Sequence, residues 1–401
     1  MGTTYMVKIH GAEDVDDDIR IDIDAELRRV NDQMSTYLKS SEISRFNASD
    51  STRWFDVSRQ TADVVDFAQQ VARKTDGAFD VTIGPVVNAW GFGPDQRTGE
   101  TPDREKLAQL KALTGFEKLS VRLDPPALRK QIPQLQVDLS AIAKGHGVDR
   151  VVTLLAEAGA TDVFVEIGGE VRTSGDKAGQ PWRVGIQLPD TAATVSMIAH
   201  ETGRGTGQDE SMATSGDYRN FFQDDGKRYS HTIDPRTAAP IVHHLASVSV
   251  VSQSCMAADA WATAINVLGP EKGLELAERE SLDAFLITRT DNGYHMMGTG
   301  LLAQYAAIAP PAAAVAADTT VRETASTGLL PTMLMSAVAM GVILLAMAIG
   351  VIFGRKAISG SCGGLANETD ADGNVSCSLC SNPADACKEL RERMQQSESP
   401  T

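Results

Sequence analysis

The chain has 401 residues, of which 53 are acidic and 37 are basic, and its formal net charge is −16. This balance argues against a nucleic-acid binder, which needs a basic face to neutralise phosphates. It does not exclude a nucleotide ligand, because a divalent cation can supply positive charge locally, and the length is enough for two or three domains.

The first 300 residues predict interspersed helices and strands. Apolar residues recur at helical spacing in RQTADVVDFAQQVARKTDG (59–77) and VDRVVTLLAEAGA (148–160). The β-branched runs in DVFVEIGGEV (162–171) and SVSVVSQS (247–254) predict strands, and the Gly pair predicts a turn. Because these elements follow no regular strand–helix–strand rhythm, we expect an α+β fold with mixed sheets and packed helices over residues 1–303.

Residues 256–269, MAADAWATAINVLG, predict a helix that ends at the Gly269-Pro270 stop signal. Asp259 and Thr263 are four residues apart, so they share one face of this helix, one turn apart. A carboxylate and a hydroxyl on one face of an apolar helix are candidate ligands for a hard divalent cation. The structural alternative is that Asp259 complements the helix dipole and Thr263 bonds back to a carbonyl group.

Two segments before this helix also concentrate polar groups. One is the segment 76–94, DGAFDVTIGPVVNAWGFGP, which could form one wall of a pocket for a planar ligand. Alternatively, it could be a Gly/Pro turn with core aromatic residues. In VDLSAIAKGHGVDR (137–150), we expect a strand to end near Asp138 and a turn to present Lys144 at the start of a helix. Backbone amides at a helix start, together with a Lys ammonium, favour a phosphate group.

The segment YSHTIDPRTAAP (229–240) contains a candidate base. His231 lies within a few residues of Asp234 and Arg236. A histidine close to a carboxylate could act as a general base. The alternative is a hydrogen-bonded histidine at the end of a strand.

Six motifs in chain order are similar to those of the FAD:protein FMN transferases, the ApbE family. They are MSTYLKSSEISRFN, DGAFDVTIGPVVNAWGFGP, VDLSAIAKGHGVDRV, EIGGEVRTSG, SHTIDPRTAAP and AADAWATAINVLG. The resemblance covers nearly all of residues 1–303, and it implies a Mg²⁺-dependent transfer of the FMN half of FAD to a Ser or Thr of an acceptor protein, with release of AMP. One departure is His146, where the family commonly has an aromatic residue such as Tyr.

The same resemblance implies a role for individual residues. Those expected to contact FAD are Met1, Tyr37, Ala78, Phe79, Asp80, Asp138, Lys144 and Ile233. Mg²⁺ would be held against the FAD diphosphate by the backbone carbonyl of Ala141, the carboxylate of Asp259 and the hydroxyl of Thr263. His231 would be the base that deprotonates the acceptor hydroxyl.

The C-terminal part of the chain predicts a membrane anchor. Residues 304–328 are rich in Ala, Pro and Thr and are expected to form a linker. Residues 329–353 carry no charge and exceed the roughly 20 apolar residues that a bilayer-spanning helix needs. Because Arg355 and Lys356 follow, we expect a cytoplasmic C-terminus and a periplasmic catalytic domain at a bacterial inner membrane. That orientation requires an export signal, which the first residues lack, so we expect either a start lost upstream or insertion as a reverse anchor.

The segment 354–401 contains four cysteines, which are Cys362, Cys377, Cys380 and Cys387. One CxxC pair with two outlying cysteines falls short of a paired zinc ribbon. In a reducing cytoplasm the thiolates would bind Fe, an iron–sulfur cluster or Zn, whereas outside the cytoplasm they would form disulfides. The span, the sequence GRKAISGSCGGL and these cysteines resemble NqrM, a maturation factor of the Na⁺-translocating NADH:quinone reductase. This resemblance implies a role in iron delivery, with flavoprotein subunits of the same reductase as acceptors.

Two other functions are compatible with the motifs. The chain could be a membrane-anchored module that binds FAD without turning it over. It could also be a pyrophosphatase that releases FMN and AMP without transfer. Flavin that stays on an acceptor in a denaturing gel would identify a transferase.

Overall fold

The computed structural model describes residues 2–11, 18–94, 101–189, 197–203, 209–216, 221–224, 227–291 and 293–307. These residues belong to the first of two units of the chain, Met1–Val315. None of the helices formed by these residues is both long enough and apolar enough to cross a membrane. The predicted membrane span and cysteine tail, and all of the predicted linker after residue 307, lie outside the described residues.

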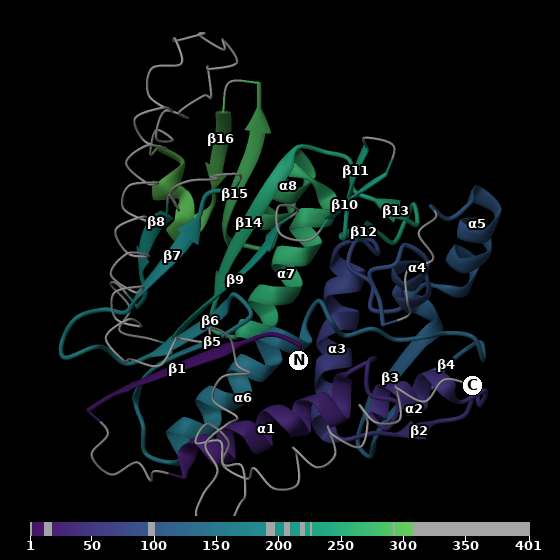
Figure 1. Ribbon diagram of the computed structural model, residues 1–401, viewed down its shortest axis with the longest axis horizontal. Helices are drawn as coiled ribbons and strands as arrows, with labels where there is room; N and C mark the ends of the chain where they lie inside the picture. The colour runs from purple at the N-terminus through teal and green to yellow at the C-terminus, as the bar shows by residue number, and fades with distance from the viewer. Residues whose placement is uncertain are drawn as a thin grey trace, which may run out of the picture. The chain divides into compact units, whose positions relative to one another are not determined.

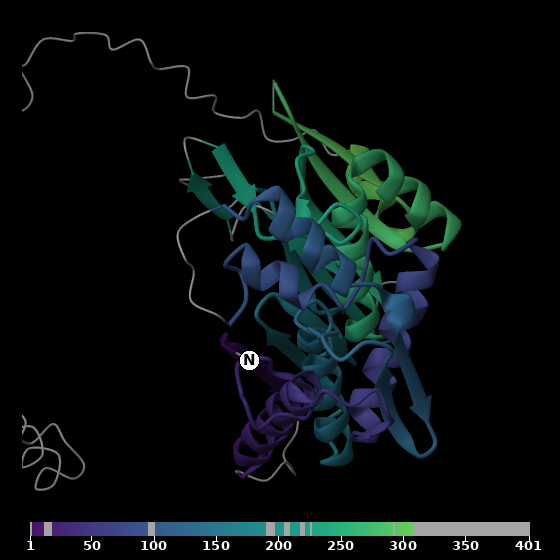
Figure 2. The same ribbon diagram turned by 90° about the vertical axis from the view of Figure 1, so that its right-hand side faces the viewer.

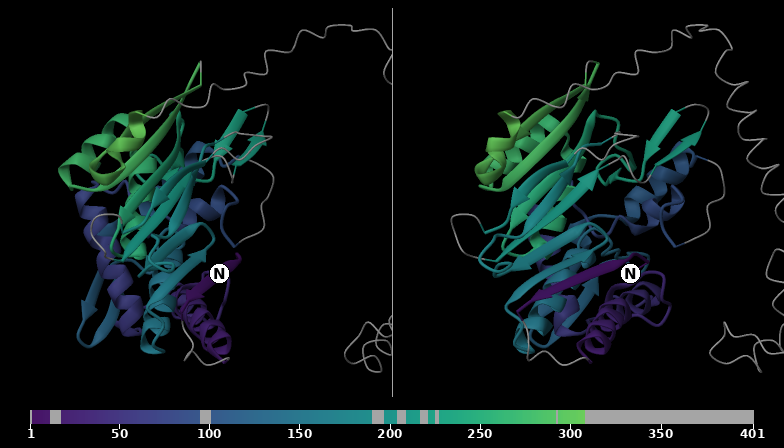
Figure 3. Two further views of the ribbon diagram at one scale, coloured as in Figure 1. Left: turned by 90° about the vertical axis from the view of Figure 1, so that its left-hand side faces the viewer. Right: turned by 60° about the vertical axis from the view of Figure 1, so that its left-hand side comes forward.

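The centre of this unit is a seven-stranded antiparallel sheet in the order β1-β5-β6-β9-β14-β15-β16. Its strands are β1 (Tyr5–His10), β5 (Asp162–Ile167), β6 (Glu170–Ser174), β9 (Glu210–Gly216), β14 (Leu245–Ser252), β15 (Asp283–Thr290) and β16 (Gly293–Gly298). Figure 3 shows β1 at one edge of the sheet and β15 and β16 toward the other. The turn Gly168-Gly169 joins β5 to β6, as the Gly pair predicts, and both glycines have a positive φ.

Helices cover one face of this sheet (Figures 1 and 2). They are α6 (Ala143–Glu157), α7 (Cys255–Leu268), α8 (Pro270–Arg279) and, at the β1 end, α1 (Ile19–Met34). Side chains alternate between the two faces of a strand. Accordingly, Val248 and Val250 of β14 pack in the same apolar cluster as Ala260 of α7, whereas Val251 packs in a separate cluster on the opposite face. Because both faces are covered, nearly all of β14 is buried.

The opposite face is covered by a hairpin and a short helix. These elements are β7 (Arg183–Gln187), β8 (Met197–Glu201) and the 3₁₀ helix η2 (Gly300–Ala307). Trp182 and Ile186 pack there against Phe285 and Ile287 of β15. The hairpin thereby buries an apolar surface that the sheet would otherwise expose to water.

The remaining elements include a second, three-stranded sheet in the order β2-β4-β3. They are β2 (Phe55–Asp56), β3 (Leu119–Leu123), β4 (Pro126–Lys130), α2 (Glu42–Ala48), α3 (Arg59–Lys74), α4 (Gly84–Ala89), α5 (Arg104–Leu113), η1 (Phe116–Lys118), and the pairs β10 (Phe221–Asp224) with β11 (Lys227–Ser230) and β12 (Ile233–Asp234) with β13 (Ala239–Pro240). Helix α3 contacts both β3 and α7, so it joins the small sheet to the central one. The α+β prediction is confirmed, and the helices predicted at 59–77, 148–160 and 256–269 correspond to α3, α6 and α7.

The strand predicted to end near Asp138 is wrong, because residues 135–139 belong to no sheet. Their backbone groups find other partners. The Asn47 side chain donates to the carbonyl of Val137 (2.8 Å) and accepts from its N–H (2.7 Å), and the N–H of Asp138 donates to the carbonyl of Val81 (2.7 Å). A side chain therefore satisfies the polar groups that a neighbouring strand would otherwise satisfy.

Candidate active site

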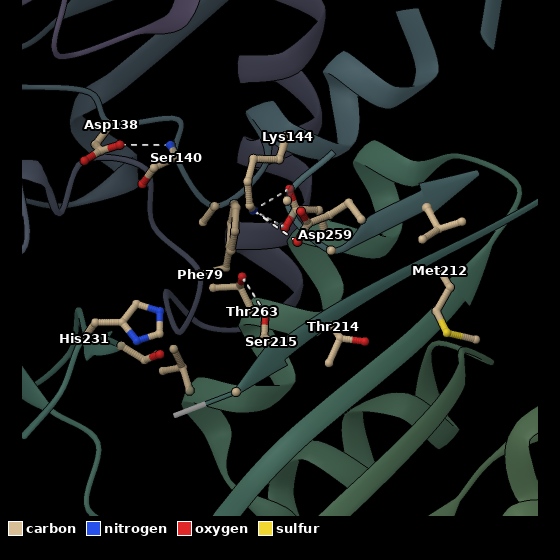
Figure 4. Close-up of a pocket in the computed structure, with 18 of the residues that line it drawn as sticks. Phe79, Asp138, Ser140, Lys144, Met212, Thr214, Ser215, His231, Asp259 and Thr263 are labelled. Atoms are coloured by element: carbon tan, nitrogen blue, oxygen red, sulfur yellow. Dashed lines mark hydrogen bonds and ion pairs between the residues drawn. The ribbon is translucent and has the colours of Figure 1, made fainter. Parts of the chain in front are cut away.

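A cavity of about 630 Å³ lies between the start of α6, the middle of α7 and the turn between β5 and β6. The predicted site residues that line it are Ala78, Phe79, Asp80, Asp138, Ala141, Lys144, His231, Ile233, Asp259 and Thr263. Figure 4 shows part of this lining. Segments that are far apart in the sequence therefore meet at one place, as the resemblance implies.

Asp259 lies on the second turn of α7 and is only 2% exposed. Its Oδ2 atom accepts a hydrogen bond of 3.0 Å from the backbone N–H of Gly145. The Nζ atom of Lys144 lies 3.3 Å from Oδ1 and 3.4 Å from Oδ2 (Figure 4). Ser254 caps this helix by accepting a hydrogen bond from the N–H of Ala257.

Lys144 also contacts a second carboxylate, because its Nζ atom lies 3.2 Å from Oε1 of Glu170. Burial alone would lower the pKa of Lys144, but the charges of Asp259 and Glu170 raise it above its ordinary value, so the side chain stays an ammonium. Burial and the charge of Asp259 raise the pKa of Glu170. One ammonium and two carboxylates therefore share one end of the cavity.

Helices α6 and α7 approach each other closely at Gly145. A Cβ atom added to this glycine would lie 2.3 Å from the carbonyl oxygen of Cys255. Because real Cβ atoms do not come that close to backbone oxygen, only glycine fits there without a shift of the helices. The close approach brings the amide of Gly145 within bonding distance of Asp259.

Thr263 lies one turn after Asp259, and both residues line the cavity, as the helical spacing predicts. The hydroxyls of Thr263 and Ser215, a residue of β9, are 3.2 Å apart (Figure 4). On the same strand, the hydroxyl of Thr214 is 2.8 Å from that of Ser249 in β14. The floor of the cavity near α7 is therefore lined by hydroxyl groups.

The two aspartates expected to contact FAD are partly engaged in local turns. Oδ1 of Asp80 accepts hydrogen bonds from the N–H (2.8 Å) and the hydroxyl (2.7 Å) of Thr82. Burial raises the pKa of Asp80, although these hydrogen bonds oppose the shift. Oδ1 of Asp138 accepts from the N–H of Ser140 (2.9 Å). Each carboxylate is thus oriented by its own turn.

His231 lies at the cavity next to Phe92, with the ring centroids 6.2 Å apart and the ring planes at 70°. The nearby carboxylate of Asp234 is bonded to the Arg236 guanidinium at 2.9 and 2.8 Å. Arg236 therefore forms hydrogen bonds with both oxygens of Asp234, the carboxylate that lies close to His231 in the sequence. The placement of His231 at the cavity fits the predicted base.

Some predicted residues lie elsewhere. Tyr37 is in the loop between α1 and α2, is 67% exposed and is not part of the cavity lining. Phe79 borders the cavity but is only 2% exposed and packs in the main apolar cluster, so it offers little ring surface to a ligand. Met1 and the four tail cysteines, Cys362, Cys377, Cys380 and Cys387, lie outside the described residues.

Most of the other cavity residues were not predicted as site residues, and two of them contact predicted ones. Glu170 follows the Gly168-Gly169 turn and is 4% exposed, and Ser215 faces Thr263. An acidic residue directly after a Gly-Gly turn, at the start of a strand, is the signal that could have indicated Glu170. The sequence around Ser215 contains no comparable signal.

The residues at this end of the cavity fit a hard cation. Within the described part of the chain there is no group of three or more His, Cys, Asp or Glu placed to hold a metal ion. The predicted set of Asp259, Thr263 and a backbone carbonyl contains only one such side chain. Oxygen ligands of this kind suit Mg²⁺, and the Lys144 ammonium beside Asp259 already marks a point where positive charge is stabilised.

Comparisons with known proteins agree with the motifs. A family model described as ApbE matches residues 1–286, and one described as (Na⁺)-NQR maturation NqrM matches residues 351–400. The FAD:protein FMN transferase of Vibrio cholerae is 46% identical over 297 residues, covering 73% of this chain and 87% of that protein. The one from Escherichia coli is 38% identical over 303 residues, covering 73% and 84%.

Solved structures have the same fold. The flavin transferase ApbE from Vibrio cholerae has a TM-score of 0.69 at 43% identity, covering 75% of this chain and 95% of that one. The ApbE protein from Thermotoga maritima has a TM-score of 0.64 at 26% identity, covering 74% and 94%. With these likenesses, the fold and the cavity define a flavin transferase. The chain belongs to the ApbE family and is an FAD:protein FMN transferase, with a C-terminal segment that matches NqrM.

Proposed function

We propose that the chain moves the FMN half of FAD to a Ser or Thr hydroxyl of an acceptor protein, in a magnesium-dependent reaction that releases AMP. The observation that carries this proposal is that Asp259, Thr263, Ala141 and His231 all line one cavity, although they come from separate segments. The volume of about 630 Å³ lies within the usual range for small-molecule sites, roughly 300–1,000 Å³.

The proposed reaction is a phosphoryl transfer. His231 takes the proton of the acceptor hydroxyl. The hydroxyl oxygen forms a bond to the phosphorus on the FMN side of the diphosphate, while the bond from that phosphorus to the bridging oxygen breaks. AMP leaves with the bridging oxygen, and FMN remains on the acceptor as a phosphoester.

Asp259, Thr263 and the carbonyl of Ala141 would hold the magnesium ion. Bound there, the ion would neutralise charge on the diphosphate and on the departing AMP. The carboxylate and hydroxyl lie one helical turn apart on the cavity wall, which supports this assignment. Lys144, at the start of α6, would add a second positive charge next to the phosphates.

A denaturing gel tests the proposal. The full-length chain is incubated with FAD, Mg²⁺ and an acceptor flavoprotein subunit, and the gel is inspected for flavin fluorescence. A transferase leaves fluorescence on the acceptor band and releases AMP in equal amount. AMP release without acceptor fluorescence would indicate a pyrophosphatase, and FAD binding without AMP release would indicate a binding module.

For the C-terminal segment we propose a role in maturing the Na⁺-translocating NADH:quinone reductase, supported by the NqrM match to residues 351–400. Its cysteines, Cys362, Cys377, Cys380 and Cys387, would bind Fe, an iron–sulfur cluster or Zn as thiolates. Flavoprotein subunits of the same reductase would then be the acceptors for FMN. Replacing Cys377 and Cys380 by Ser should lower the iron content of the reductase, and an unchanged iron content would contradict this role.

We also propose that residues 329–353 form a single membrane span. The uncharged composition of this segment and the following Arg355 and Lys356 support a catalytic domain in the periplasm and a tail in the cytoplasm. Protease treatment of spheroplasts tests the orientation. Degradation of the catalytic domain, with protection of a C-terminal epitope, is the expected result.

A further inference from the structure

Lys144 is held between two carboxylates at nearly equal distances. Its Nζ atom is 3.2 Å from Oε1 of Glu170 and 3.3 Å from Oδ1 of Asp259. The side chains of Glu170 and Asp259 are only 5% and 3% exposed, whereas that of Lys144 is 31% exposed. The flexible partner of this group is therefore the lysine, and the two carboxylates are enclosed by the fold.

The backbone around Glu170 is firmly fixed. Glu170 begins β6 and pairs with Ile167 of β5 across the Gly168-Gly169 turn. The N–H of Gly168 donates to the carbonyl of Thr4, which ties the turn to the chain just before β1. Glu170 cannot follow a moving partner far, so its carboxyl group stays in one place beside Lys144.

The hydrogen bonds of Glu170 are incomplete. Its Oε1 atom contacts Lys144, but Oε2 is buried and has no hydrogen-bond partner among the described residues. A buried carboxylate oxygen without a hydrogen-bond partner destabilises the fold, so such an atom is expected to have a functional role. Glu170 therefore has the capacity to accept a second hydrogen bond from the three donors of an ammonium group.

The charges explain why a second carboxylate is needed. Asp259 is the carboxylate assigned to magnesium, but here its Oδ1 atom is 3.3 Å from an ammonium. A lysine without another partner would compete with the ion for Asp259, and the two cations would repel each other at short range. Oδ2 of Asp259 is fixed by the N–H of Gly145 at 3.0 Å, which leaves Oδ1 as the oxygen that must be released.

We propose that Glu170 is a positioning residue that takes over the Lys144 ammonium when a divalent cation binds Asp259. This inference rests on the metal site proposed above. Glu170 then keeps Lys144 inside the cavity and away from Oδ1 of Asp259. The lysine needs only a small movement, because it contacts both carboxylates already.

The test measures cation binding rather than turnover. Mn²⁺, which accepts the same oxygen ligands as Mg²⁺, is titrated into the full-length chain saturated with ADP, a diphosphate that has no flavin to transfer. Free Mn²⁺ is followed by electron paramagnetic resonance. We expect Glu170→Gln to raise the Mn²⁺ dissociation constant about tenfold, because Lys144 then remains on Asp259.

A double-mutant cycle with Lys144→Met separates this role from its alternatives. If Glu170 acts through the lysine, Glu170→Gln changes the dissociation constant by less than about twofold once Lys144 is Met. If Glu170 were a direct ligand or acted only through its charge, the tenfold loss would persist in the Lys144→Met background, which would overturn the proposal. An unchanged dissociation constant for Glu170→Gln alone would overturn it too.

Glu157 provides the control. It is the last residue of α6, it is exposed, and it is not part of the cavity lining, but it loses the same charge on conversion to Gln. Glu157→Gln should leave the Mn²⁺ dissociation constant within about twofold, and a tenfold loss there would overturn the specific role of Glu170. Failure of the unmodified chain to bind Mn²⁺ would instead remove the metal site itself, and both proposals with it.

Discussion

Asp149 of α6 accepts a hydrogen bond of 3.0 Å from the backbone N–H of Cys255, the first residue of α7. Its other oxygen accepts from the N–H of Met256 (2.9 Å) and from the hydroxyl of Ser254 (2.8 Å). The first N–H groups of a helix have no partners within the helix, and a negative charge there is favourable. Asp149 therefore fixes the start of α7 on α6, one turn before Asp259.

Replacing Asp149 by Ala should lower the free energy of unfolding by about 2 kcal/mol or more, because the first amide groups of α7 lose a charged acceptor. Arg172 would also lose its hydrogen bond of 2.7 Å to Asp149. Urea unfolding of the purified chain, followed by circular dichroism, measures the change. We also expect weaker Mn²⁺ binding, because Asp259 is carried by the same helix.

An exposed aspartate gives the control for this substitution. Asp63 pairs with Arg59 at 2.7 Å, and both side chains are largely exposed. Exposed ion pairs contribute little to stability, so Asp63→Ala should change the free energy of unfolding by less than about 1 kcal/mol. Equal losses for the two variants would contradict the capping role of Asp149.

Asp259→Ala should lower the rate of AMP release from FAD by orders of magnitude and make the remaining rate insensitive to added Mg²⁺. The reason is that the carboxylate assigned to the ion is lost, while the oxygen ligands that remain are uncharged. The measurement is the rate of AMP release over a range of Mg²⁺ concentrations. Asp259→Asn keeps the shape and should give the same result, whereas a rate that still responds normally to Mg²⁺ would refute the assignment.

His231→Gln should block transfer of FMN to the acceptor while FAD still binds, because the hydroxyl loses its base but the cavity keeps its shape. Transfer is followed by flavin fluorescence of the acceptor, and binding by equilibrium titration with FAD. His295, which is exposed on β16, is the control, and His295→Gln should preserve both. Parallel loss of binding and transfer in His231→Gln would point to a structural role instead.

The parts of the site that follow from local spacing could be predicted from the sequence. Asp259 and Thr263 share a face because a helix repeats every 3.6 residues, and the Ala-rich segment 256–269 leaves no other local structure for them. Lys144 at the start of α6 follows in the same way from the turn that precedes it. The order of six motifs then indicated the family, and the comparisons confirm it.

The parts that depend on tertiary contacts could not be predicted. Lys144 and Asp259 are 115 residues apart in the chain, and nothing local in either segment indicates that they meet. The second carboxylate, Glu170, follows a Gly-Gly turn that was a local signal, but its contact with Lys144 is tertiary and was not predicted. The strand expected near Asp138 failed because the side chain of Asn47 supplies the hydrogen bonds that a neighbouring strand would give.

His146 makes the chain sensitive to acid. It is 8% exposed in α6, and its Nε2 atom has no hydrogen-bond partner among the described residues. Burial lowers its pKa from an ordinary value of 6.5 to about 4, although the negative charge of Asp149 opposes the shift. Between these two values the unfolded chain binds a proton that the folded chain does not, so the free energy of unfolding falls as the pH drops from 6.5 toward 4.

His146→Phe removes this group. It should reduce the loss of unfolding free energy between pH 6.5 and 4 by up to about 3 kcal/mol, since each pKa unit corresponds to about 1.4 kcal/mol. The family commonly has an aromatic residue at this position, so we expect the variant to fold. Urea unfolding at a series of pH values from 7 to 4 measures the effect, and His295→Phe serves as the exposed control. Curves for His146→Phe and the unmodified chain that stay parallel over this range would show that His146 is protonated in the folded chain, contrary to the burial argument.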